Sequence, residues 1–146
     1  MTNFNHILVP SDFRTASAKA LDVAVTLAKK FDAKVTLLHV WEIPIYPYMD
    51  FMLNTEVISS VEEAATKGLE QALAALRRQL PTAQSQLRTG EAWREILDAI
   101  KELQADLVVM GTHGRRGLSH LTLGSVAEKV VRLSPVPVLT VQEPTG

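Results

Sequence analysis

The sequence contains no cysteine, and this absence excludes several chemistries at once. Without thiols the chain cannot form disulfides, use a cysteine nucleophile or bind a metal through cysteine. Its formal net charge of -1 gives no electrostatic reason to expect nucleic acid or an anionic membrane surface as a partner. No apolar run is long enough to span a bilayer, and the first residues do not resemble a signal segment. We therefore expect a cytoplasmic protein with no nucleic acid and no membrane as partners.

Three common site signatures are also missing. There is no G-x-x-x-x-G-K-[S/T] loop, and no G-x-G-x-x-G follows the first predicted strand. The stretch Leu87-Arg-Thr-Gly90 lacks the aspartate that a phospho-receiver domain would need after its third strand. These absences argue against a P-loop enzyme, a dinucleotide-binding domain and a receiver domain.

The sequence does contain a regular alternation of apolar, strand-like runs and amphipathic, helix-like segments. We find no internal repeat, linker or low-complexity run, so residues 1–146 are expected to form one domain. A Ser-Val-Glu-Glu pattern at Ser60 is typical of a capping box and predicts the start of the second helix, which Pro81 ends. Its inward side is predicted to carry Val61, Ala65, Leu69, Ala72, Leu73, Leu76 and Leu80. The predicted strands are His6–Pro10, Lys34–Val40, Ala83–Arg88, Asp106–Met110 and Val138–Val141.

This alternation predicts an α/β fold, namely a doubly wound, Rossmann-like parallel sheet of five strands. Strands that are apolar throughout imply helices on both faces of the sheet. Right-handed crossovers leave few topologies, and if the order reverses beside the first strand it is 3-2-1-4-5. The carboxyl ends of strands one and four would then flank the crevice in which such sheets bind ligands.

The most informative stretch follows the fourth predicted strand. That strand ends in Gly111-Thr-His-Gly114, and after nine further residues Gly124-Ser125 opens an amphipathic helix. Strand, glycine loop and helix start form an arrangement in which backbone N–H groups hold phosphate. Glycines at 111 and 114 would let those amides approach phosphate oxygens, and Gly124 would leave room at the helix start. The alternative is that these glycines are turn and helix-entry residues.

Side chains near this stretch could add contacts. The Ser125 hydroxyl could bind a phosphate oxygen or Mg²⁺. His113 and Arg115 could contact phosphate, although loop residues of these types are often simply solvated. Asp12, after the first strand, could accept a hydrogen bond from an adenine amino group or a ribose hydroxyl, or could cap the next helix. The backbone of Val40 could read an adenine edge.

Half of the aromatic residues lie in the segment 41–55, which also carries Pro44 and Pro47. Prolines remove backbone donors and resist regular structure. The segment is therefore expected either to pack onto the core as a loop, or to act as a flap over a ligand or a contact for a partner.

Taken together, these motifs resemble the universal stress protein family. The spacing G-x-x-G, nine residues, then G-[S/T], is that of the family's ATP-binding branch, and it is met by Gly111, Gly114, Gly124 and Ser125. The matching stretches are Ile7–Asp12, Leu37–Val40, Asp106–Arg115, Leu123–Val126 and Pro135–Leu139.

The resemblance implies a protein that binds ATP, and whose nucleotide occupancy alters its conformation or its partner binding. The alternative is a slow ATPase or a nucleotidyl-transfer enzyme, although no second carboxylate is evident beside Asp12 to hold a metal or activate water. Mg²⁺ would accompany ATP at Ser125. The resemblance also implies a homodimer paired through Val138, Leu139, Thr140 and Val141. The predicted nucleotide contacts are Pro10, Ser11, Asp12, Val40, Met110, Gly111, His113, Gly114, Arg115, Gly124, Ser125 and Val126.

Overall fold

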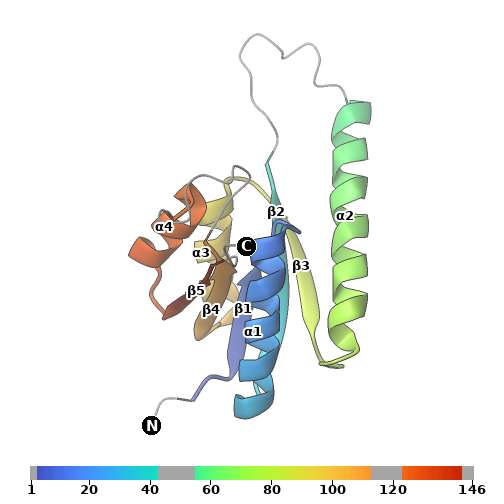
Figure 1. Cartoon of the computed structure of the whole chain (residues 1–146). Helices are drawn as coiled ribbons and strands as arrows, with labels where there is room; N and C mark the ends of the chain where they lie inside the picture. Colours follow the sequence, from blue (N-terminus) through green and yellow to red (C-terminus); the bar gives the residue numbers. More distant parts are fainter. Residues whose placement is uncertain (1–2, 43–54, 113–122, 143–146) are drawn as a thin grey trace.

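The computed structural model describes residues 3–42, 55–112 and 123–142. Strands and helices alternate through these residues, as the hydropathy pattern predicts (Figure 1). In chain order the elements are β1 (His6–Pro10), α1 (Thr15–Phe31), β2 (Lys34–Trp41), α2 (Thr55–Arg77), β3 (Gln84–Thr89), α3 (Ala92–Leu103), β4 (Leu107–Gly111), α4 (Ser125–Leu133) and β5 (Val138–Val141).

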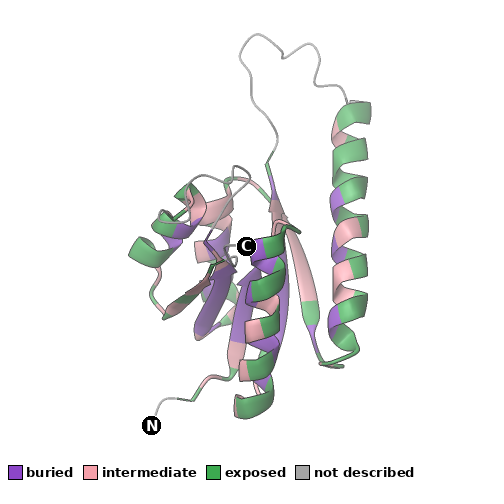
Figure 2. Cartoon of the chain, viewed as in Figure 1, coloured by how far each residue is buried: buried purple, intermediate pink, exposed green. Residues whose placement is uncertain are grey.

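The strands form one parallel sheet in the order β3-β2-β1-β4-β5, which confirms the predicted topology. Alternate residues of the central strands enter two separate cores. Ile7 and Val9 of β1 pack with α1 and α2, whereas Leu8 packs with α3 and α4. Both faces of the sheet are therefore covered, and the buried residues line the strands and the inner sides of the helices (Figure 2). This two-sided burial explains why the strands are apolar throughout.

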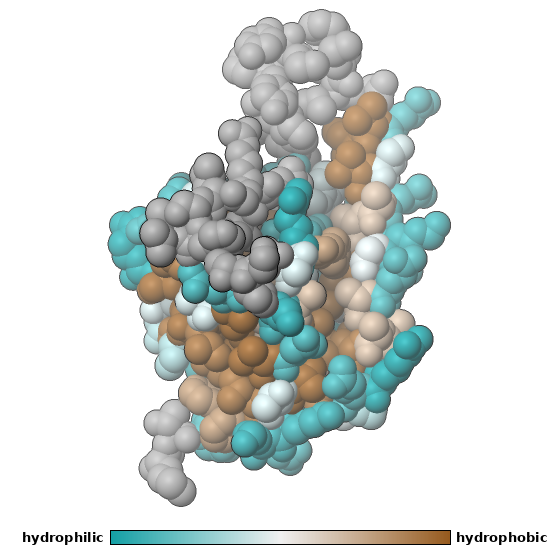
Figure 3. Space-filling model, viewed as in Figure 1, coloured by the Kyte–Doolittle hydropathy of each residue, from teal (hydrophilic) through white to brown (hydrophobic). Residues whose placement is uncertain are grey.

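The start of α2 differs from the prediction. The helix begins at Thr55, so the capping-box serine, Ser60, lies inside it and is exposed. Val61, predicted to face inward, is 42% exposed, and Val57 is 44% exposed. The reason is length, because the first turns of α2 extend past the strands and leave apolar surface at that end (Figures 1 and 3). A local capping pattern could not reveal how far the helix runs beyond the sheet.

The sheet opens between β1 and β4, where the site was predicted. The paired residues of these strands end at Leu8 and Val108, although β1 continues to Pro10 and β4 to Gly111. The chain then leaves β1 for a helix on one face and leads from β4 towards a helix on the other. Such a reversal leaves a crevice at the carboxyl ends of the strands.

Within the described ranges, none of the helices is both long enough and apolar enough to cross a membrane.

Candidate functional site

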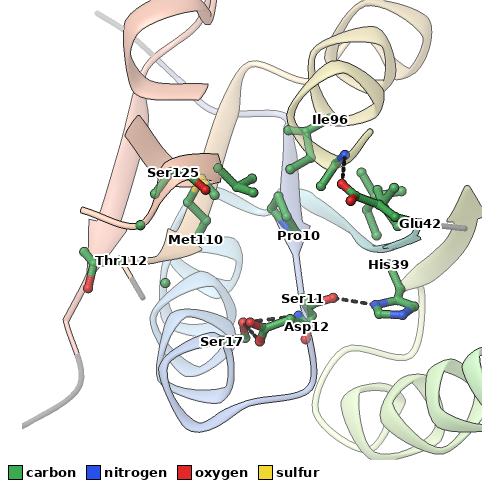
Figure 4. A pocket seen from close by; sticks show the side chains of 17 residues that line it. Pro10, Ser11, Asp12, Ser17, His39, Glu42, Ile96, Met110, Thr112 and Ser125 are labelled. Atoms are coloured by element: carbon green, nitrogen blue, oxygen red, sulfur yellow. Dashed lines mark hydrogen bonds between the residues drawn. The ribbon is translucent and has the colours of Figure 1, made fainter. Parts of the chain in front are cut away.

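A cavity of about 370 Å³ occupies the opening between β1 and β4. Its volume lies within the usual range for small-molecule sites. Figure 4 shows side chains that reach it from the ends of three strands and from the first turns of the helices that follow. The lining residues are Pro10, Ser11, Asp12, Ser17, Leu38, His39, Val40, Glu42, Ala92, Ile96, Met110, Gly111, Thr112, Gly124, Ser125, Val126 and Ala127.

Every described residue that the sequence predicted for nucleotide contact lies on this wall. Three others, His113, Gly114 and Arg115, lie outside the described residues, as does most of the aromatic segment. The residues brought together are Pro10, Ser11, Asp12, Val40, Met110, Gly111, Gly124, Ser125 and Val126.

Asp12 lies two residues before Arg14, the N-cap of α1, and so is not itself the capping residue. Its Oδ1 accepts hydrogen bonds from the Arg14 N–H at 3.0 Å and from the Ser17 hydroxyl at 2.8 Å. Ser17 is buried and was not predicted as a site residue. Among the described residues no hydrogen bond reaches the second carboxylate oxygen of Asp12, so one oxygen holds the loop while the other remains available to a ligand.

His39 holds the same loop from the β2 side. Its Nδ1 lies 2.7 Å from the carbonyl oxygen of Ser11, and since a carbonyl only accepts, this nitrogen carries the proton. The Ser11 N–H donates in turn to the Leu38 carbonyl at 2.8 Å. The imidazole also stacks on Phe13, with ring centroids 4.2 Å apart, and Phe13 has a φ of 65°. Such a φ is rare for a bulky residue, so the loop is shaped by its contacts rather than by local preference.

The backbone of Val40 faces the cavity because of strand alternation. The Leu38 carbonyl accepts from Ser11 on the β1 side, whereas the Trp41 carbonyl accepts a hydrogen bond on the β3 side. Alternate residues of a parallel strand present their N–H and C=O groups to the same edge. Val40 therefore faces the β1 side, like Leu38, at a level where β1 has already ended.

At the other end of the cavity, the backbone connects β4 to α4. The Gly124 N–H donates to the Thr112 carbonyl at 2.6 Å, and the Thr112 N–H donates to the Val141 carbonyl at 3.1 Å. Gly124 is the N-cap of α4 with a φ of -62°, and Ser125 is its first helical residue. The first amides of a helix lack intrahelical partners and give its N-terminus a partial positive charge. This end of the cavity can therefore hold an anion.

The packing of α1 against β4 requires glycine at position 111. A Cβ at this position would lie 2.9 Å from both the carbonyl carbon and the Cβ of Ala16 in α1. Real Cβ contacts are not this short, so α1 can approach β4 here because residue 111 is glycine. Access for phosphate is the role predicted for this glycine, whereas the packing of α1 behind it depends on the fold and has no local signal in the sequence.

Two tryptophans stand next to cavity residues. Trp41 follows Val40, and Trp93 follows Ala92. Both indole nitrogens are buried, and neither finds a hydrogen-bond partner among the described residues. The Trp93 ring is approached by the Arg94 guanidinium at 5.0 Å and by the Lys129 ammonium at 5.1 Å. The segment 41–55, which begins with Trp41, is predicted as a loop or flap, and the sequence gives no signal that Trp93 lies beside the cavity.

The described residues contain no group of three or more histidine, aspartate or glutamate side chains placed to hold a metal ion. This arrangement fits Mg²⁺ only in the form it takes beside nucleotides, where phosphates and water supply most of its ligands. Ser125, exposed at the start of α4, is a hydroxyl of the kind that completes such a set.

Comparison with known proteins gives consistent matches over nearly the full chain. A model described as the universal stress protein family matches residues 3–142. Universal stress protein YxiE of Bacillus subtilis is 36% identical over 147 residues, covering 95% of this chain and 99% of that protein. The solved structure of UspA from Lactobacillus plantarum is 25% identical with a TM-score of 0.82, covering 97% of this chain and 99% of that one.

A solved universal stress protein structure from Arabidopsis thaliana has AMP bound. It is 20% identical to this chain with a TM-score of 0.68, and covers 97% of this chain and 93% of that one. At this identity the likeness shows a shared fold. The family match reaches further, because residues 3–142 include the strands, the glycine pattern and the residues around the cavity. The chain belongs to the universal stress protein family.

Proposed function

We propose that the chain binds ATP in the cavity between β1 and β4, and that occupancy of this cavity alters its conformation or its partner binding. One observation carries the proposal: described residues predicted from separate motifs, such as Asp12, Val40 and Ser125, all line one cavity at the reversal of the sheet. The AMP-bound structure from Arabidopsis thaliana, which shares the fold, supports an adenine nucleotide as the ligand.

The β2 end of the cavity suits adenine. Val40 offers an N–H and a C=O on the β1 side of β2, beyond the point where β1 ends. The edge of adenine pairs an acceptor, N1, with a donor amino group, so it complements these two groups. Guanine presents the opposite pattern, with a donor at N1 and an acceptor at O6, and would place like groups together. The free oxygen of Asp12 would accept from the adenine amino group or from a ribose hydroxyl.

The α4 end of the cavity suits phosphate. The amides of Ser125 and Val126 begin a helix whose N-cap, Gly124, has no side chain to occupy them. An anion there gains from hydrogen bonds and from the helix dipole. Mg²⁺, when bound with ATP, would screen the charge of the phosphates, and the Ser125 hydroxyl would serve as its protein ligand.

The backbone offers a route from this end of the cavity to the edge of the sheet. Thr112 lines the cavity and donates its N–H to Val141 of β5, the last strand of the sheet. We propose that two copies pair through β5, Val138–Val141. Leu139 on β5 is 40% exposed, and Val131 and Leu133 of α4 are 43% and 46% exposed. A partner strand would cover the open edge and this apolar surface.

Calorimetry with ATP, ADP and GTP tests the nucleotide proposal. We expect one site that binds ATP at least about tenfold more tightly than GTP, which is a difference of about 1.4 kcal/mol. Mass spectrometry of the denatured, freshly purified protein would identify a nucleotide carried through preparation. Equal affinity for the two bases, or no binding by a protein shown to be nucleotide-free, would contradict the proposal.

Sedimentation tests the dimer separately. Leu139→Lys places a charge on the exposed edge of β5 and is expected to give folded monomers. Lys34→Leu, far from this edge at the start of β2, serves as the control and should sediment like the wild type. A Leu139→Lys variant that remains dimeric would overturn pairing through β5.

A further inference from the structure

Three helices begin at or beside the cavity, and any of their N-termini could attract an anion. Ser17 in the first turn of α1, Ala92 of α3 and Ser125 of α4 all line the wall. Each N-terminus carries about half a positive charge. A nucleotide could therefore bind in more than one direction unless the three ends differ.

The N-terminus of α3 is already occupied by a carboxylate. Glu42, just after β2, accepts a hydrogen bond from the Ala92 N–H at 2.8 Å through its Oε1 (Figure 4). Ala92 is the first residue of α3, and its N-cap, Glu91, makes no side-chain cap bond. In the described part of the chain, no cation pairs with Glu42. Its negative charge thus lies at the helix end and on the cavity wall.

The start of α1 is also associated with a carboxylate. Asp12 accepts from the Arg14 N–H at the N-cap of α1 and from the Ser17 hydroxyl. At α4, by contrast, Gly124 supplies no carboxylate, and the acid of its first turn, Glu128, bonds to Arg132 at 3.0 Å. Of the three helix starts at the cavity, α3 has a carboxylate on its first amide and α1 has one on the N–H of its N-cap residue. In the described residues, α4 has no carboxylate at its start.

We infer that Glu42 is a specificity-determining residue that sets the direction of the bound nucleotide, an inference that rests on the proposed function. Its carboxylate takes the place a phosphate would take at α3 and repels a second anion there. The phosphates are left with α4, and the base with the wall formed by Val40, Ala92 and Ile96. Figure 4 shows Glu42 and Ser125 on opposite sides of Pro10, as this direction requires.

The test uses inorganic pyrophosphate, which has charge but no base. In the wild type we expect pyrophosphate to shift the backbone amide resonances of Ser125 and Val126 and to leave those of Ala92 and Trp93 unchanged. In Glu42→Ala the α3 amides should shift as well, with affinity at that end raised about tenfold. Glu42→Gln keeps a hydrogen-bond acceptor and loses the charge, so its effect should be smaller, about threefold.

Glu91→Gln is the matched control. Glu91 stands at the same helix end, but its carboxylate bonds to Arg94 at 2.8 Å rather than to a helix amide. This variant should bind pyrophosphate like the wild type. ATP carrying Mn²⁺ gives a second readout, because the metal broadens the amides nearest the phosphates. Broadening should stay at α4 in the wild type and appear partly at α3 in Glu42→Ala.

The inference is overturned if pyrophosphate shifts Ala92 in the wild type, if it leaves α4 unshifted there, or if Glu42→Ala and Glu42→Gln both match the wild type. These outcomes are separate from failure of the proposed function. A wild type that binds pyrophosphate at α4 but does not bind ATP would contradict the nucleotide proposal and leave the role of Glu42 at α3 supported.

Discussion

At the β1–β2 end of the cavity, polar side chains make the hydrogen bonds, whereas at the β4–α4 end the backbone supplies the polar groups. Asp12 bonds to Ser17, and His39 bonds to the carbonyl of Ser11. At the other end, Gly124 donates through its N–H to the carbonyl of Thr112. The β1–β2 end therefore depends on which side chains are present, and the β4–α4 end depends on the glycines that leave the backbone accessible.

The largest effect is expected on the free energy of unfolding, at the β4–α4 end, where β4 packs closely against α1. Gly111→Val places a Cβ against the backbone of Ala16, and we expect it to lower the free energy of unfolding by about 3 kcal/mol. Urea denaturation measures the loss. Gly124→Ala is the control, because Gly124 has a φ of -62° that alanine adopts freely. A Gly111→Val variant as stable as the wild type would show that the close approach of α1 is not required.

The next largest effect is expected on ligand affinity at the β1–β2 end of the cavity. Asp12→Ala removes a charged acceptor, and we expect the affinity for ATP to fall about 30-fold, with the affinity for pyrophosphate unchanged. Calorimetry with both ligands separates the two ends of the cavity. Asp98→Ala, which removes an exposed acid of α3, should leave both affinities unchanged. If Asp12→Ala weakened both ligands equally, the separation of the two ends would be wrong.

A smaller effect on ATP affinity is expected at the β4–α4 end of the cavity. Ser125→Ala keeps the helix amides and removes one hydroxyl, so we expect about a threefold loss of ATP affinity in the presence of Mg²⁺. Without Mg²⁺ the loss should be smaller still if the hydroxyl acts through the metal. Ser134→Ala, at the other end of α4, is the comparison variant. A loss as large as that of Asp12→Ala would mean that side chains dominate at both ends.

The smallest effect is expected on thermal stability, from the ion pairs that join β3 to α3 next to the β1–β2 end of the cavity. Arg88, opposite Val40 in the β2–β3 register, bonds to Glu95 and Glu102 of α3. The hydrogen bond and charge of Arg88 hold the pKa of Glu102 below its ordinary 4.5. A lowered carboxyl pKa stabilises the fold above the unfolded value, and this contribution is lost as pH falls through the folded value.

Arg88→Met should therefore lower the melting temperature by about 2–4 °C at pH 7, and by less as falling pH begins to protonate Glu102. Melting curves of the wild type and the variant across pH 3 to pH 7 measure this, on a scale set by the carboxyl range. A difference that stays constant across this range would show that Arg88 acts through packing of its stem rather than through its charge.

The sequence predicted most of the fold because strand and helix periods are local signals. The five apolar or alternating runs lie within a residue of the observed strands. Their alternation left few strand orders, and the family resemblance implied the one observed. The start of α2 could not be predicted in this way. Ser60 carries a proper capping pattern, but the helix continues through it to Thr55.

The candidate site residues that could be predicted are those that belong to a local sequence pattern. Glycines at 111 and 124 stand out after a strand and before a helix. The bonds of Ser17, His39 and Glu42 do not, because each depends on a partner brought close by folding. Glu42 accepts a hydrogen bond from a residue 50 positions away, and no local sequence pattern predicts this contact. The predicted contacts of His113, Gly114 and Arg115 remain predictions.

The placement of the two tryptophans gives the molecule a built-in optical reporter. Trp41 and Trp93 are the chain's full set of indoles, and each directly follows a residue of the cavity wall at the β2–α3 end. Their emission therefore samples the side that would receive a purine ring, while the α4 side contributes no indole. Trp41→Phe and Trp93→Phe would divide the signal between a strand end and a helix start, without attaching a dye to a chain that has no thiol to carry one.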